Sequence, residues 1–278
     1  MRGLVLLAAA AWTAPALAAA EPPAAPPVPP HETFAIASAR VGETRTITVY
    51  LPPGYAAAAG RRYPVLYMPD GGLAEDFPHV ASDVDAAIRD GGMRPLIVVG
   101  IENTQRRRDM TGPTEVESDR TIAPHVGGSA AFRAFLADEL MPEVRRRYRT
   151  DGRSAIIGES LAGLFVLETF FLQPHLFDTF IALSPSLWWS GGALLRSAPA
   201  ALEGWPPRLR RTLWVATASD DDIDGAGQRL QAMLAAHAPA GLAWHYDPRP
   251  DLHHADIYRR ASPAILRDLF PPESARTR

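Results

Sequence analysis

The chain has 278 residues, of which 47% are hydrophobic, and a formal net charge of −3 at pH 7. This length and apolar content suit one sizeable globular domain, and the near-neutral charge gives no reason to expect nucleic acid or an anionic membrane as a partner. There is no cysteine, which excludes disulfides, a thiol nucleophile and thiolate metal sites. All 28 basic residues are arginine, which also excludes a phosphate-binding lysine, a Schiff-base lysine and a serine–lysine dyad.

The first 20 residues have the pattern of a secretory signal peptide. Arg2 is followed by an apolar stretch and then by small residues with an A-x-A-like cleavage site. The apolar stretch is too short to cross a bilayer, so no integral membrane span is expected. Residues 21–30 are a proline-rich tether. We therefore expect a single domain over residues 31–278, in a periplasmic or secreted protein.

Beyond the tether, strand-like and helix-like segments alternate. The first two β-rich segments flank Val41-Gly42-Glu43 and predict a hairpin. The expected strands are residues 34–40, 44–51, 63–68, 95–100, 154–157, 179–183, 212–218 and 242–246, and the expected helices are residues 84–89, 130–149, 161–172, 224–238 and 263–270. Strands that are apolar throughout and alternate with helices predict an α/β fold, with a mostly parallel sheet covered on both faces and an antiparallel N-terminal edge.

Ser160 lies in a strand–turn–helix segment that is typical of a nucleophile elbow. The serine of an elbow occupies a strained turn, so its flanking residues must be small. Gly158 meets this need, whereas Ala162 stands where the G-x-S-x-G pattern has its second glycine, and Gly163 follows one position late. An ordinary turn in which the serine caps the helix is the alternative interpretation.

The ends of the predicted strands supply a serine, an acidic loop and histidines in that order along the chain. Ligands of open α/β sheets bind at the carboxyl ends of the strands, and nucleophile, acid, histidine is the order found in α/β-hydrolases. We expect Ser160 to attack a carbonyl carbon with His254 as general base, and His253 is the alternative base. Asp221 is the first choice for the acid that orients the histidine.

Other interpretations of the acidic loop and of the histidine pair stay open. Asp220, Asp222 and Asp224 are alternative acids, and the loop can also be a solvated one that caps the next helix. The adjacent histidines lack an H-E-x-x-H pattern, and D-D-D-I-D lacks the spacing of a calcium loop. We therefore expect neither a metal nor a cofactor.

Backbone N–H groups and strand-end side chains complete the predicted site. The N–H groups of Leu161 and Gly72 are the expected oxyanion donors. Trp188 and Trp189 follow a strand and are candidate walls of an acyl pocket, with core packing as the alternative. Arg108, together with Arg106 and Arg107, is a candidate contact for an anionic substrate. The alternative for these arginines is a basic loop paired with nearby acids.

The region 131–189 resembles the "Putative esterase" family of α/β-hydrolases, which includes enterochelin-esterase-like and periplasmic trilactone hydrolases. The matching stretches are F-L-A-D-E-L-M-P-E-V-R-R-R-Y-R-T, I-G-E-S-L-A-G-L-F-V-L and L-F-D-T-F-I-A-L-S-P-S-L-W-W, supported by Y-P-V-L-Y-M-P-D-G, V-V-G-I-E-N-T and H-H-A-D-I-Y. The resemblance implies a metal-independent serine hydrolase of esters, with Ser160 as nucleophile, His254 as base, and Leu161 and Gly72 as oxyanion donors. Glu159 departs from the histidine that relatives often carry there, and the acidic loop does not match closely.

The residues and the resemblance together predict a serine esterase that acts on a small-molecule carboxylic ester, with siderophore-type esters among the candidate substrates. Two alternatives remain. One is an acyltransferase with the same machinery, because sequence does not show whether water is excluded from the acyl-enzyme. The other is a non-catalytic binding protein on a hydrolase scaffold, which family membership alone does not exclude.

Overall fold

The computed structural model describes residues 28–220 and 225–273. The predicted signal peptide, most of the tether and the acidic residues 221–224 therefore lie outside the described residues. The described part of the chain forms an eight-stranded sheet with the strand order β1-β2-β4-β3-β5-β6-β7-β8. β1 begins at His31, the residue that follows the predicted tether.

The sheet is mixed, as the sequence predicts. The N-terminal hairpin is antiparallel and continues antiparallel onto β4, while the other neighbouring strands pair in parallel. The strands are β1 (His31–Ser38), β2 (Glu43–Tyr50), β3 (Tyr63–Pro69), β4 (Ile97–Ile101), β5 (Thr150–Glu159), β6 (Thr179–Leu183), β7 (Arg211–Ala218) and β8 (Leu242–Arg249). This arrangement confirms the α/β-hydrolase fold class, and it puts the carboxyl ends of β3 to β8 at one edge.

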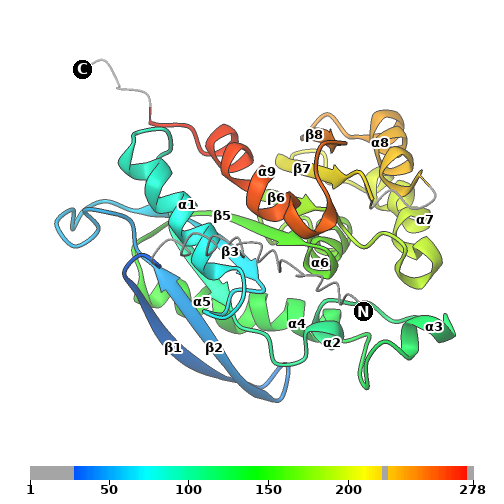
Figure 1. The fold of residues 1–278 in the computed structure, drawn as a ribbon, viewed down its shortest axis with the longest axis horizontal. Helices are drawn as coiled ribbons and strands as arrows, with labels where there is room; N and C mark the ends of the chain where they lie inside the picture. Colours follow the sequence, from blue (N-terminus) through cyan, green and yellow to red (C-terminus); the bar gives the residue numbers. More distant parts are fainter. Residues whose placement is uncertain (1–27, 221–224, 274–278) are drawn as a thin grey trace, which may run out of the picture.

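Helices cover both faces of the sheet (Figure 1). The helices are α1 (Phe77–Arg89), α2 (Arg106–Asp109), α3 (Glu117–Arg120), α4 (Ser129–Phe135), the π-helical η1 (Leu136–Leu140), α5 (Met141–Arg147), α6 (Leu161–Leu172), α7 (Trp189–Glu203), α8 (Ala226–His237) and α9 (His254–Leu269). α1 and α9 build one apolar core with the sheet, and α4 to α8 build the other. The site residues are thus held from both sides.

Helix α6 is apolar around its whole circumference because it is covered on all sides. Residues 161–171 are buried, as expected for a helix with no solvent-facing stripe. The ring of Phe165 packs against Phe132 of α4 at 5.1 Å between centroids. On the same side, the buried carboxylate of Glu168 accepts hydrogen bonds from Ser129 and Arg133. These contacts hold α6 against α4.

Several predicted helix bounds are wrong. The helix expected at residues 130–149 is interrupted by η1 just before Pro142, whose missing N–H cannot continue the i→i−4 ladder. The helix expected at residues 84–89 begins at Phe77, and α7 lies where no helix was predicted.

The last helix begins at His254 and not at Pro263, which lies inside it. Its N-terminus is stabilised by a capping box in which His253 and Asp256 exchange side-chain and backbone hydrogen bonds. The prediction of a helix start at Pro263 is wrong, because the His253–Asp256 capping pair lies earlier in the chain, with His253 as the N-cap. The correction matters for the site, because it makes His254 the first residue of a helix.

Candidate active site

Ser160 occupies the sharp turn between β5 and α6 with φ 60° and ψ −121°. This is a sparsely populated backbone conformation for a residue other than glycine, which costs about 1–3 kcal/mol. A Cβ on Gly158 would lie 2.7 Å from the backbone carbonyl carbon of Ala162 and 2.8 Å from its methyl group. Glycine at position 158 is therefore what leaves room for alanine in place of the second elbow glycine.

Positive φ recurs at the strand ends around the serine. Asp70, Ser160 and Ser184 have φ of 55°, 60° and 40°, and each is the residue that follows the last residue of β3, β5 or β6. Such strain persists where the surroundings fix it, and it clusters at functional sites. The strand ends therefore mark one region of the molecule as a candidate site.

His254 and Ser160 meet at this edge of the sheet. The Nε2 atom of His254 lies 3.1 Å from Ser160 Oγ, which is within the reach that proton transfer requires. The backbone N–H of His254 donates to Asp220 at 2.8 Å, so the loop after β7 holds the first residue of α9 in place. His253 lies beside Ser219 and Asp220 with 71% of its side chain exposed. The geometry therefore favours His254 over His253 as the base.

The acid of a catalytic triad remains a prediction. Asp221, with the alternatives Asp222 and Asp224, lies outside the described residues. Asp220, the remaining candidate, accepts the backbone N–H of His254, and its other carboxylate oxygen is 3.6 Å from His253 Nδ1. These contacts place Asp220 beside His254 and His253, and they assign no triad role.

A pocket with a cavity volume of about 460 Å³ opens onto Ser160. Its lining carries two cations, two serines and the candidate base: Arg106, Arg107, Ile122, Ser160, Leu161, Ser186, Trp188, Asp220 and His254. This volume falls within the usual range for small-molecule sites. The lining thus combines two arginine side chains with the partly exposed indole of Trp188.

The three predicted binding residues, Trp188, Trp189 and Arg108, have different surroundings. Trp188 lines the pocket and is 45% exposed, whereas Trp189 is 4% exposed. The indole N–H of Trp189 donates to the carbonyl of Gly112 at 2.9 Å. Arg108 lines a neighbouring pocket and pairs with Glu43 and Asp109. Substrate contact by Trp189 or Arg108 stays a prediction, and core packing and ion pairing account for both side chains.

The two predicted oxyanion donors differ in their surroundings. Leu161 lines the pocket and begins α6, where the first N–H groups of a helix have no intrahelical partner. The Gly72 N–H donates to the Glu75 carboxylate at 2.7 Å. Glu75 would therefore have to release this N–H before Gly72 could serve an oxyanion.

Two further side chains that the sequence did not point to lie near the serine. Glu159 Oε1 lies 3.1 Å from His254 Nε2, and Ser186 Oγ lies 3.5 Å from Ser160 Oγ. Burial raises the pKa of Glu159 to about 7, opposed by the charges of His254 and Arg106. The sequence signals for Glu159 were its position between the glycine and the serine of the elbow and its departure from the histidine that relatives often carry there.

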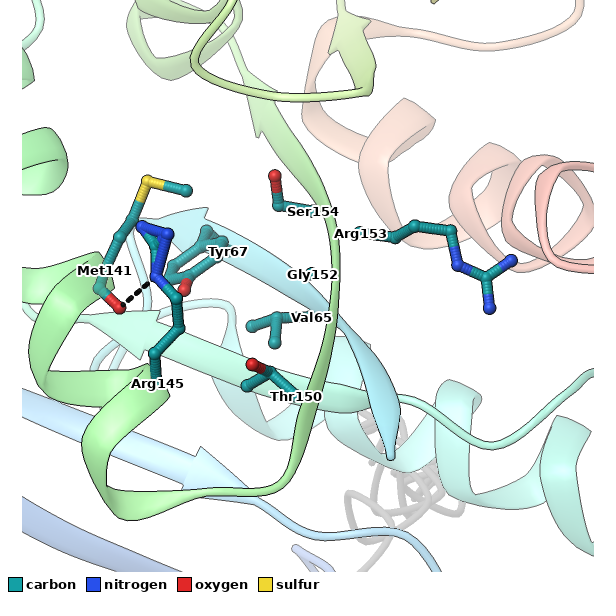
Figure 2. Close-up of a pocket in the computed structure, with 8 residues that line it drawn as sticks. All are labelled: Val65, Tyr67, Met141, Arg145, Thr150, Gly152, Arg153 and Ser154. Atoms are coloured by element: carbon teal, nitrogen blue, oxygen red, sulfur yellow. Dashed lines mark hydrogen bonds between the residues drawn. The ribbon is translucent and has the colours of Figure 1, made fainter. Parts of the chain in front are cut away.

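A second, small pocket lies away from the serine, between α5 and the strands β3 and β5 (Figure 2). Its cavity volume is about 20 Å³, enough for a water molecule. Arg145 lies over it and donates from Nε to the carbonyl of Met141. It offers no room for a substrate of the size that the Ser160 pocket accepts.

Residues 28–220 and 225–273 contain no group of three or more His, Asp or Glu side chains arranged to hold a metal ion. In the same ranges, no helix has the length and apolar character needed to cross a membrane.

The chain is similar in sequence to a known protein family. The sequence signature of the family described as "Putative esterase" matches residues 38–243. The chain belongs to this family. The match includes Ser160 and the pocket residues up to Asp220, while His254 lies beyond it.

Relatives with assigned names are siderophore esterases. The chain is 32% identical over 174 residues to ferri-bacillibactin esterase BesA of Bacillus subtilis, covering 55% of this chain and 58% of that protein. It is 30% identical over 190 residues to the siderophore triacetylfusarinine C esterase of Aspergillus fumigatus, covering 64% and 63%. These matches thus span less than two thirds of either relative.

Among solved structures, an IroE-like serine hydrolase from Shewanella oneidensis superposes with a TM-score of 0.78 at 27% identity. The superposition covers 87% of this chain and 80% of that one. The esterase fold of this family therefore extends over most of the chain.

Proposed function

We propose that this protein hydrolyses carboxylic esters through a serine nucleophile, with siderophore-type esters as the favoured substrates. The observation that carries the proposal is the 3.1 Å contact between His254 Nε2 and the strained Ser160 Oγ, at the floor of a substrate-sized pocket. The names of the relatives supply the siderophore class. Arg106 and Arg107 in the pocket suit the negative charge that such ligands carry.

The reaction follows from the positions of these groups. Ser160 Oγ bonds to the ester carbonyl carbon while its proton passes to His254 Nε2. The carbonyl oxygen becomes an oxyanion, which the Leu161 N–H stabilises, and one such donor contributes about 3–4 kcal/mol. The C–O bond to the alcohol then breaks as His254 returns the proton to the leaving oxygen. Water attacks the acyl-enzyme by the same steps in reverse, which releases the acid and restores Ser160.

The remaining parts of the proposal rest on the sequence. An acid from the loop 220–224, with Asp221 as first choice, orients His254. The signal-peptide pattern of residues 1–20 suggests a periplasmic or secreted protein. Neither part is needed for the ester cleavage test.

The test is a fluorophosphonate probe read by intact mass, beside hydrolysis of a short p-nitrophenyl ester. We expect a single adduct that is lost in Ser160→Ala, together with turnover that is lost in the same variant. A ferric siderophore ester then serves as the specific substrate, with product acids measured by chromatography. Absence of both adduct and turnover would overturn the proposal, and an adduct without turnover on any ester would favour the acyltransferase.

A further inference from the structure

The Nε2 atom of His254 has two neighbours that compete for it. Ser160 Oγ lies 3.1 Å away, and Glu159 Oε1 also lies 3.1 Å away. A serine hydrolase needs this nitrogen as a free acceptor for the serine proton. A carboxyl group at the same distance either donates a proton to it, when neutral, or holds a proton on it, when ionised.

We propose that Glu159 is a second proton-sharing partner of His254 Nε2, which sets the pH above which Ser160 can be activated and stabilises the imidazolium once it forms. The proposal deepens the proposed function and rests on it. Glu159 contacts the reacting nitrogen itself, so it would act directly on the proton that moves between Ser160 and the leaving group.

The burial of Glu159 gives the interaction its strength. Its side chain is 15% exposed, so the contact to His254 is only partly screened by water. In the described part of the chain, no hydrogen-bond donor other than His254 reaches Oε1. Sharing a proton with the imidazole is therefore the favourable way for this buried carboxyl group to be solvated.

Other charges face the pair from each element packed around it. Arg106 of α2 favours the ionised carboxylate, while Asp70 after β3 and Asp76 before α1 oppose it. Asp220, after β7, accepts a hydrogen bond from the backbone N–H of His254. Arg106 is bound by Asp70 in two hydrogen bonds, whereas His254 Nε2 contacts the Glu159 carboxylate directly at 3.1 Å.

The proton balance gives the direction of the effect. A proton shared between Glu159 and His254 Nε2 must pass to solvent before Nε2 can accept the proton of Ser160. Above that transition the carboxylate stays ionised and faces the imidazolium that forms as Oγ attacks. Glu159 therefore raises the pH at which activity begins, and it increases the rate on the alkaline plateau.

The test compares the pH profile of kcat/KM for ester hydrolysis in the wild type and in Glu159→Gln, with Glu143→Gln on the exposed face of α5 as the matched control. We expect the acid limb to move to lower pH by about one unit or more in Glu159→Gln, the usual size for loss of an adjacent opposite charge. We also expect a lower alkaline plateau. Glu143 lies in an ion-paired surface cluster, so its variant should keep the wild-type profile.

A second readout separates failure of this proposal from failure of the proposed function. If the wild type hydrolyses esters and Ser160→Ala does not, the function stands, and an acid limb unchanged or raised in Glu159→Gln overturns the role of Glu159. If Glu159→Gln does not fold, Glu159→Asp replaces it. We then expect the acid limb of its kcat/KM profile to lie between that of the wild type and the limb that an isolated histidine would give. Histidine NMR titration in the Ser160→Ala background should show the His254 imidazole titrating at lower pH when Glu159 is replaced, and an unchanged midpoint would overturn the proposal.

Discussion

Arg106 and Asp70 are joined by two hydrogen bonds, of 2.7 Å and 2.8 Å, beside the candidate nucleophile. Asp70 is buried, whereas 35% of the Arg106 side chain is exposed and lines the Ser160 pocket. The aspartate thus fixes the guanidinium, and the remaining N–H groups can face a ligand. Bidentate pairing of this kind holds an arginine in one orientation.

This pair predicts that Arg106 contributes to the binding of anionic esters. In Arg106→Gln we expect KM to rise about tenfold or more for a negatively charged ester and to change little for a neutral ester of similar size. Arg108→Gln is the matched control, because Arg108 is engaged by Glu43 and Asp109, and it should lower stability with little effect on either KM. Equal KM changes for charged and neutral esters would contradict this assignment.

The two tryptophans should separate into a binding residue and a core residue. Trp189→Ala should lower the free energy of unfolding by about 3–5 kcal/mol, because it empties a buried site. Trp188→Ala should leave stability nearly unchanged and raise KM for esters with large acyl groups. Chemical denaturation and steady-state kinetics on both variants check this, and a large loss of stability in Trp188→Ala would contradict it.

The contact between Gly158 and Ala162 predicts a coupled pair of substitutions. Gly158→Ala should destabilise the protein by about 1–3 kcal/mol, since the new methyl would meet the Ala162 backbone and side chain. Adding Ala162→Gly should recover part of the loss, because it removes the methyl but not the backbone contact. A double-mutant cycle on unfolding free energies measures the coupling, and strictly additive effects would show that the two sites do not interact.

The two adjacent histidines should have separate roles. His254→Ala should lower kcat by roughly 10⁴-fold or more, because a base and its nucleophile act as a unit. His253→Ala should keep most activity and lose about 1 kcal/mol of stability, because His253 is the cap of α9. Steady-state kinetics and thermal unfolding on both variants decide the matter, and an inactive, folded His253→Ala would reverse the assignment.

Glu43 should contribute to the acid sensitivity of the fold. Its hydrogen bonds from Arg108, Thr104 and Arg45 lower its pKa from 4.5 to about 2. A lowered pKa in the folded state means that the contribution to stability is complete above pH 4.5 and is lost as the pH falls toward 2. The unfolding free energy of Glu43→Gln should therefore depend less steeply on pH in this window than that of the wild type. Parallel slopes would exclude a role for this carboxylate.

The sequence predicted the local features that depend on neighbours along the chain. The buried strands and the apolar helix after the elbow follow from hydrophobic periodicity and length. α6 and β6 have the predicted bounds. The first residue of α9 was missed because a proline offered a stronger apparent start signal than the His253–Asp256 capping pair.

Side-chain partners across the fold depended on tertiary structure. Ser160 and His254 are 94 positions apart, and only the packing of α9 against the sheet brings Nε2 to Oγ. The same packing adds Glu159 as a second neighbour of Nε2, which the spacing of residues in the elbow does not reveal.

The sequence by itself predicted the class of chemistry. Without cysteine or lysine, a serine in an elbow followed by an acidic loop and a histidine pair leaves few other nucleophile–base combinations. Tertiary structure decided which arginines reach the pocket and which tryptophan is exposed. It also decided that the Gly72 N–H donates to Glu75. The reason is physical: periodicity and turn residues act locally, whereas hydrogen bonds and burial are set by elements that meet only when the whole sheet has assembled.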